Sequence, residues 1–89
     1  MSRYFFSMSD GVQTVHDREG TELPGLAAVQ DELIEFGLKV LKHKFSYGIE
    51  DPAKWSIEVM NEDHRVLTKL PLIKLKHLQR LHRQHRHAA

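Results

Sequence analysis

Apolar and polar residues alternate near the start of the chain, which predicts a strand with one buried face. Between Arg3 and Met8 the large apolar residues on one side are Tyr4, Phe6 and Met8. Ser9-Asp10-Gly11 then supplies turn residues, and residues 12–16 contain the β-branched positions of a second strand. Gly20 follows in a polar run that is typical of a second reversal. The opening is therefore predicted to be a hairpin.

From Leu26 onward the apolar residues recur at helical spacing, which predicts one long helix from Leu26 to Ser46. They form two adjacent stripes that together cover roughly 200° of the helix, about twice the minimum width for a helix that faces one core. We therefore expect something besides one sheet to cover this helix. Gly37 lies within the apolar arc, where a missing side chain permits close approach of a neighbouring element. The stripes are Leu26, Val29, Leu33, Phe36 and Val40, and Ala27, Ile34, Leu38, Leu41 and Phe45.

Two more extended segments follow the helix. Residues 55–61 alternate as a strand, residues 61–64 form a polar turn, and residues 66–70 return as a strand that Pro71 ends. The order β-β-α-β-β predicts an α+β domain over residues 1–71, with a four-stranded antiparallel sheet and the helix on one face. The expected core is Tyr4, Phe6, Leu33, Phe36, Val40, Trp55, Ile57 and Val59. The other face is expected to expose Phe5, Met60 and Leu67.

Residues 72–89 are predicted to be a basic amphipathic helix or tail. Residues 1–73 contain all twelve Asp and Glu residues but only eight of the thirteen Lys and Arg residues, a formal charge of −4. Residues 74–89 contain the other five basic residues and no acidic one, a formal charge of +5. An acidic body with a basic appendage favours a role for the appendage in contacts between molecules or along the body.

Several short motifs together resemble a family of small alphaproteobacterial proteins classed as a domain of unknown function. They are Arg3-Tyr4-Phe5-Phe6 with Asp10-Gly11, Asp17-Arg18-Glu19-Gly20 with Leu23-Pro24, Trp55-Ser56-Ile57-Glu58-Val59, and Leu70-Pro71. The resemblance covers about residues 1–72 and implies a compact α+β domain, with no activity, cofactor or site to carry over. The chain departs from the family pattern at Ser7, where a His is common, at Gly25, where an Asp would cap the helix, and at His64, where a Gly would ease the turn.

The sequence contains no recognisable catalytic, cofactor or metal signature, so we predict a protein that is not an enzyme and needs no cofactor. His16 and Asp17 are neighbours in an extended segment and point to opposite faces, so they do not form an acid–base pair. Four acidic residues near the turns could gather around a cation, but their spacing does not match an EF-hand loop, and turns are commonly acidic: Asp10, Asp17, Glu19 and Glu22. Histidines of the tail are read as adventitious metal ligands.

The function predicted best is a non-catalytic interaction module that binds itself, as a homodimer, or another protein. Its possible interface residues are Phe5, Met60, Leu75 and Leu78. The alternative is a nucleic-acid-binding accessory protein whose tail contacts phosphates through Lys74, Lys76, Arg80, Arg83 and Arg86. The sequence has no cysteine and no apolar run long enough for a membrane span, so we expect a cytoplasmic protein that does not bind a membrane.

Overall fold

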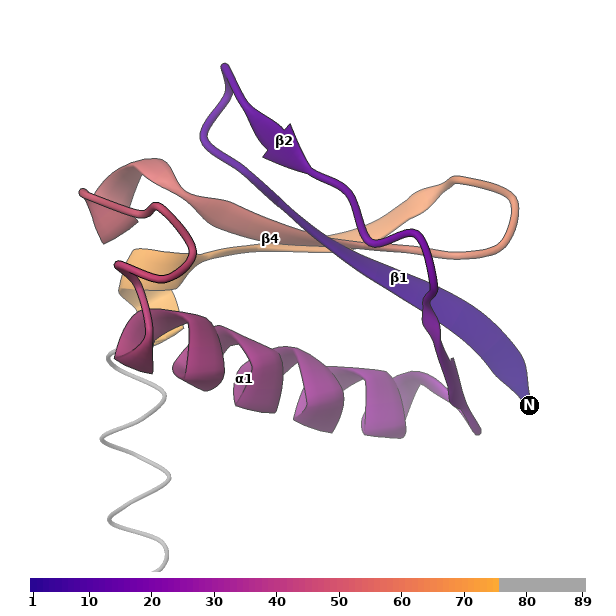
Figure 1. The fold of residues 1–89 in the computed structure, drawn as a ribbon. Helices are drawn as coiled ribbons and strands as arrows, with labels where there is room; N and C mark the ends of the chain where they lie inside the picture. Colours follow the sequence, from indigo (N-terminus) through magenta and orange to yellow (C-terminus); the bar gives the residue numbers. More distant parts are fainter. Residues whose placement is uncertain (76–89) are drawn as a thin grey trace, which may run out of the picture.

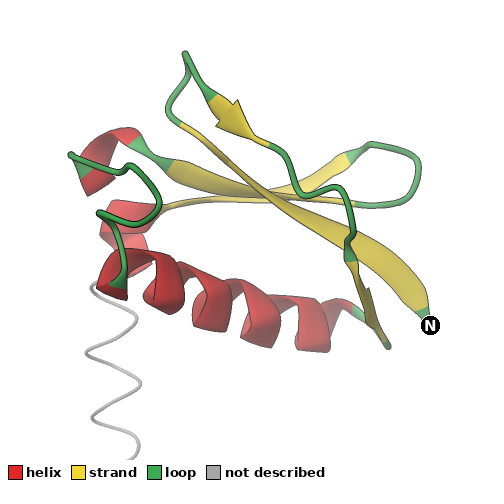
Figure 2. Ribbon diagram, in the orientation of Figure 1, coloured by secondary structure: helices red, strands yellow, loops and turns green. Residues whose placement is uncertain are grey.

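The computed structural model describes residues 1–75, and in them an antiparallel sheet carries one long helix across one face (Figures 1 and 2). This confirms the predicted α+β class. The sheet has five strands rather than the predicted four. The elements are β1 (Ser2–Ser9), β2 (Thr14–Val15), β3 (Thr21–Leu23), α1 (Leu26–Lys42), the 3₁₀ helix η1 (Pro52–Lys54), β4 (Ser56–Met60) and β5 (Val66–Pro71), after which residues 72–75 are helical.

The strand order is β2-β1-β4-β5, and β3 pairs with the other end of β1. Both β2 and β3 run antiparallel to β1, with Met8 opposite Val15 and Arg3 opposite Glu22. The sequence predicted a second reversal around Gly20, and this prediction is wrong, because β2 and β3 run in the same direction. After β2 the chain leaves the edge of β1, and it then pairs with β1 again as β3. The predicted second strand over residues 12–16 is correspondingly reduced to two residues.

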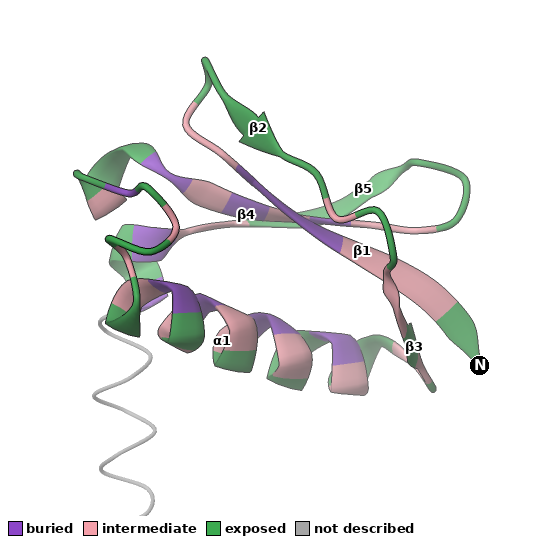
Figure 3. Cartoon of the chain, viewed as in Figure 1, coloured by how far each residue is buried: buried purple, intermediate pink, exposed green. Residues whose placement is uncertain are grey.

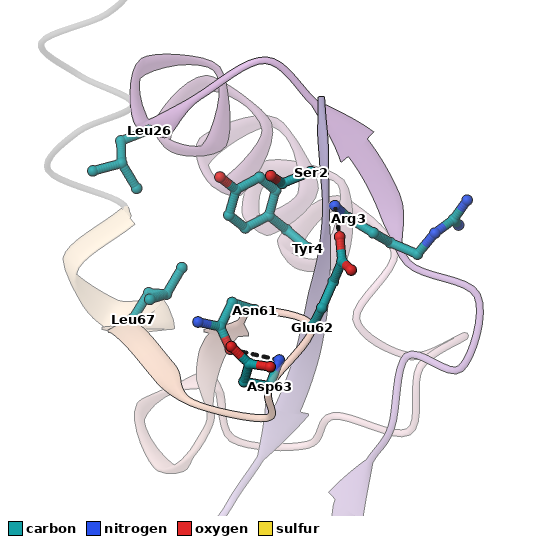
Figure 4. Close-up of a pocket in the computed structure, with 8 residues that line it drawn as sticks. All are labelled: Ser2, Arg3, Tyr4, Leu26, Asn61, Glu62, Asp63 and Leu67. Atoms are coloured by element: carbon teal, nitrogen blue, oxygen red, sulfur yellow. Dashed lines mark hydrogen bonds between the residues drawn. The ribbon is translucent and has the colours of Figure 1, made fainter.

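A β-bulge in β5 changes the face on which Leu67 lies. Val59 is opposite Thr68 and Met60 is opposite Val66, so Leu67 has no direct partner on β4. An extra residue of this kind shifts the alternation of side chains along a strand. Leu67 therefore points to the side of the sheet that faces α1, and the expectation that it lies on the other face is wrong (Figure 4).

Helix α1 ends at Lys42, four residues earlier than predicted, and turns occupy residues 43–48. The last helical contact is the His43 N–H, which donates to the Lys39 carbonyl at 3.0 Å. Gly48 has φ of +74°, a conformation that favours glycine, and so closes the series of turns. Phe45, predicted to belong to the apolar stripe, lies beyond the helix and is 80% exposed.

The core lies between α1 and the sheet, where the helix turns its buried side toward the strands (Figure 3). Six predicted core residues are buried, whereas Tyr4 and Phe36 are half-buried at its edge. Leu72 and Leu75 are fully buried, so the packed domain extends past its predicted boundary at Pro71. No helix in residues 1–75 combines the length and apolar character needed to cross a membrane. The core residues are Phe6, Met8, Val29, Leu33, Val40, Ile49, Trp55, Ile57, Val59, Leu72 and Leu75.

Candidate interaction cleft

A cleft of about 400 Å³ lies between the beginning of α1 and the hairpin that joins β4 to β5. Figure 4 shows Leu26 and Leu67 on two sides of the cleft, with the Tyr4 ring between them. Polar groups from the hairpin and from the first residues of β1 close its other end. The lining residues are Ser2, Arg3, Tyr4, Leu26, Asn61, Glu62, Asp63 and Leu67.

The apolar walls of the cleft follow from the local structure of α1 and β5. Leu26 is the first residue of α1 and is 67% exposed. The bulge turns Leu67 toward this opening and leaves it 42% exposed. Tyr4 is half-buried and packs against the core. The cleft is thus the open end of the hydrophobic core, where apolar surface remains in contact with water.

The acidic rim of the cleft is fixed by hydrogen bonds in the β4–β5 hairpin. The Asn61 side chain accepts the backbone N–H groups of Asp63 and Arg65, both at 3.0 Å. Glu62 Oε1 accepts the backbone N–H of Arg3 at 2.9 Å. The rim therefore presents the carboxylates of Glu62 and Asp63 beside the two leucines, in an ordered turn.

The Arg3 guanidinium points away from this rim (Figure 4). Its Nη1 donates to the Glu19 carbonyl at 2.6 Å, and its Nη2 contacts the Glu22 carboxylate at 3.0 Å. Arg3 thereby joins β1 to β3 and is occupied by partners on that side of the sheet. The charge that borders the cleft is consequently acidic.

Asp17 organises the segment between β2 and β3, a role that the sequence analysis missed. Its carboxylate accepts backbone N–H groups from Phe6 at 3.0 Å, Glu19 at 3.2 Å and Gly20 at 3.0 Å. Its own N–H donates to the buried Ser7 hydroxyl at 3.2 Å. In a continuous strand pair the Phe6 N–H would donate to a backbone carbonyl of the neighbouring strand, and here the Asp17 carboxylate accepts it instead. The Asp-x-x-Gly spacing typical of an Asx turn is the signal that could have indicated it.

Two of the four acidic residues considered as cation ligands, Asp10 and Asp17, instead accept hydrogen bonds from backbone N–H groups. Asp10 caps the β1–β2 turn, where its carboxylate accepts the N–H groups of Gln13 at 2.6 Å and Val12 at 2.8 Å. These two hydrogen bonds, with the larger effect from Gln13, lower the pKa of Asp10 below its ordinary value. Within residues 1–75, no group of three or more His, Asp and Glu side chains is arranged to hold a metal ion.

The residues proposed from the sequence as an interface have different environments. Phe5 and Met60 are paired neighbours on the face away from α1, and both are half-buried. A Cβ at Gly20 would be 2.8 Å from the Phe5 ring, so the β2–β3 segment covers part of this face. Leu75 is fully buried and belongs to the core rather than to an exposed interface. Leu78 lies outside the described residues.

Among the five basic residues proposed to contact nucleic acid, Lys74 is exposed next to the buried Leu75. The others lie outside the described residues: Lys76, Arg80, Arg83 and Arg86.

The structure brings together Tyr4, Leu26 and Leu67, which were not grouped from the sequence. The bulge in β5 and the exposed end of α1 place these residues around one opening.

The fold and the cleft define a small α+β domain with an incompletely covered hydrophobic core. The chain belongs to the family described as Domain of unknown function (DUF6894), whose model matches residues 3–73. Comparisons with curated proteins and with solved structures gave no match. The matched region contains all the apolar residues of the cleft.

Proposed function

We propose that this protein is a non-catalytic interaction module that self-associates through the cleft lined by Tyr4, Leu26 and Leu67. The observation that carries the proposal is the exposure of Leu26 and Leu67, at 67% and 42%, on opposite walls of one opening into the core. Covering such side chains contributes about 25 cal/mol for each Å² of apolar surface removed from water. The free domain therefore gains stability when a partner covers them.

The shape and lining of the cleft support a macromolecular partner more than a small substrate. The cleft is a groove at the surface with leucines on its walls and carboxylates at its rim, where Asn61 holds the hairpin turn and Glu62 accepts the Arg3 N–H. Protein interfaces commonly combine such an apolar centre with a polar rim. We propose a cytoplasmic location, since a chain without cysteine suits a reducing compartment.

The solution mass of the protein tests this proposal. Light scattering over a concentration series should give a dimer of twice the 10.4 kDa chain mass. Leu67→Asp should convert it to a monomer, because a carboxylate buried in an apolar contact is costly. Phe45→Asp is the matched control, since Phe45 is also exposed but lies at the other end of α1, and it should remain dimeric. A monomeric wild-type protein, or a dimeric Leu67→Asp variant, would overturn the proposal.

Nucleic-acid binding is the second candidate function, and the segregation of charge favours it. The five basic residues of positions 74–89 occur without a single acidic residue. Five phosphate contacts would give a slope of log affinity against log salt of about −4.5 for duplex DNA. Fluorescence anisotropy with labelled duplex at two salt concentrations tests this, with Arg80, Arg83 and Arg86 all changed to Ala as the comparison. Binding that ignores these substitutions, or no binding at low salt, would eliminate this function.

A further inference from the structure

We infer that the cleft is occupied by the basic segment 76–89 of a second copy of the chain, so that two copies exchange these segments. This inference rests on the proposed self-association and names the part of the partner that enters the cleft.

The cleft and the segment are complementary in charge. Glu62 and Asp63 border the cleft, and the Arg3 guanidinium, held by Glu19 and Glu22, does not neutralise them. Residues 76–89 contain four Lys and Arg residues and no acidic one. Bringing these opposite charges together is favourable in an interface. The acidic rim repels the acidic body of another copy, so the basic segment is the part of that copy that the rim favours.

The cleft and the segment are also complementary in apolar chemistry. Leu26 and Leu67 form the exposed walls, and Tyr4 lies between them. Segment 76–89 contains Leu78 and Leu81 among its basic residues. Leucines flanked by Lys and Arg fit a groove with leucine walls and an acidic rim, because amphipathic segments bind such grooves through their apolar side chains.

Chain length favours a second copy as the source of the segment. Leu75 is anchored beside Gly37, because a Cβ at Gly37 would overlap the Leu75 side chain. Gly37 is eleven residues along α1 from Leu26, a distance of about 16 Å. Leu78 follows Leu75 by three residues, which span at most about 10 Å even when fully extended. The backbone at Leu78 therefore falls short of its own cleft, although Leu81, six residues beyond Leu75, can span about 20 Å. A second copy is thus the source from which both leucines can enter one cleft.

Complementation between two full-length variants tests the exchange. The cleft variant is Leu67→Asp, and the segment variant carries Leu78→Glu and Leu81→Glu. Each alone should have a dimer dissociation constant at least about tenfold higher than the wild type. A mixture should form a one-to-one heterodimer more readily than either alone, since one variant keeps the segment and the other keeps the cleft. Val12→Asp, at a residue 91% exposed away from the cleft, is the control and should dimerise normally.

The possible results separate this inference from the proposed function. If the wild type and the segment variant are both dimers while Leu67→Asp is a monomer, the cleft is the interface but segment 76–89 is not its occupant. If both variants are monomers and their mixture stays monomeric, the exchange is also overturned. A monomeric wild type overturns both the exchange and self-association. Circular dichroism and Trp55 fluorescence verify that each variant is folded, and dimerisation that weakens with added salt is expected from the charge complementarity.

Discussion

Replacing Gly37 with Ala should destabilise the protein, although alanine is the better helix former. In an exposed helix the replacement stabilises by about 1 kcal/mol. At Gly37 a Cβ would overlap the Leu75 side chain and lie 3.2 Å from Ile57 Cδ1. Both neighbours are fully buried, so neither can move into solvent. Overpacking of this kind costs about 1–3 kcal/mol, which leaves a net destabilisation of about 1 kcal/mol.

The same replacement should become stabilising when Leu75 is shortened. Leu75→Ala removes the overlapping atoms and by itself costs about 2–5 kcal/mol. Adding Gly37→Ala to that variant should recover about 1 kcal/mol, so the two changes are coupled by about 2 kcal/mol. Leu75→Val provides a milder background if the alanine variant is too unstable to measure.

Urea denaturation monitored by fluorescence of the buried Trp55 measures these free energies. The difference between Glu35→Gly and Glu35→Ala, at an exposed position in the interior of α1, calibrates the preference for alanine over glycine in this helix and should be about 1 kcal/mol. If Gly37→Ala stabilises the wild type by that same amount, Leu75 does not pack on Gly37 and the reasoning is refuted.

Three further predictions concern turns and caps. Gly25→Asp should stabilise by about 1 kcal/mol in urea denaturation, because Gly25 is an extended N-cap without a side-chain hydrogen bond; Gly25→Ala, which cannot cap, should not reproduce that gain. His64→Gly should raise the free energy of unfolding by about 0.5–1 kcal/mol, since His64 has φ of +63°; an unchanged or lower value would contradict this. The lowered pKa of Asp10 means that its stabilisation is present above its ordinary pKa of 3.8 and is lost as pH falls below that value and through the folded-state pKa. Asp10→Asn should therefore lose less stability than the wild type on acidification below pH 3.8 in urea denaturation, and equal losses in both proteins would contradict this.

Periodicity was sufficient to predict β1, α1, β4 and β5, because each is long enough for one face to repeat against the core. It predicted β2 over residues 12–16 although only two residues form it, and it missed the three-residue β3; both short strands lie at the edge of the sheet. Their positions depend on the Asp17 carboxylate, which replaces a strand partner for Phe6. A hydrogen bond between residues eleven positions apart leaves no trace in an alternation of apolar and polar residues.

The cleft could not be predicted from the sequence for a related reason. Alternation placed Leu67 on the face away from the helix, and the bulge opposite Val59 and Met60 reversed it. Leu26 was assigned to the apolar stripe of the helix because it follows helical spacing, but it is the first residue of α1 and is 67% exposed. Spacing along the chain therefore did not reveal the exposure of either leucine, which depends on the bulge for Leu67 and on the position at the helix end for Leu26.

The family match and the charge distribution divide the proposed interface into two parts. Tyr4, Leu26 and Leu67 lie within residues 3–73, the region that the family model matches, whereas Leu78 and Leu81 lie outside it. The cleft of this chain thus lies within the matched region, whereas the segment proposed to occupy it lies outside that region. The exchange needs both parts, because the cleft of one copy must receive segment 76–89 of the other.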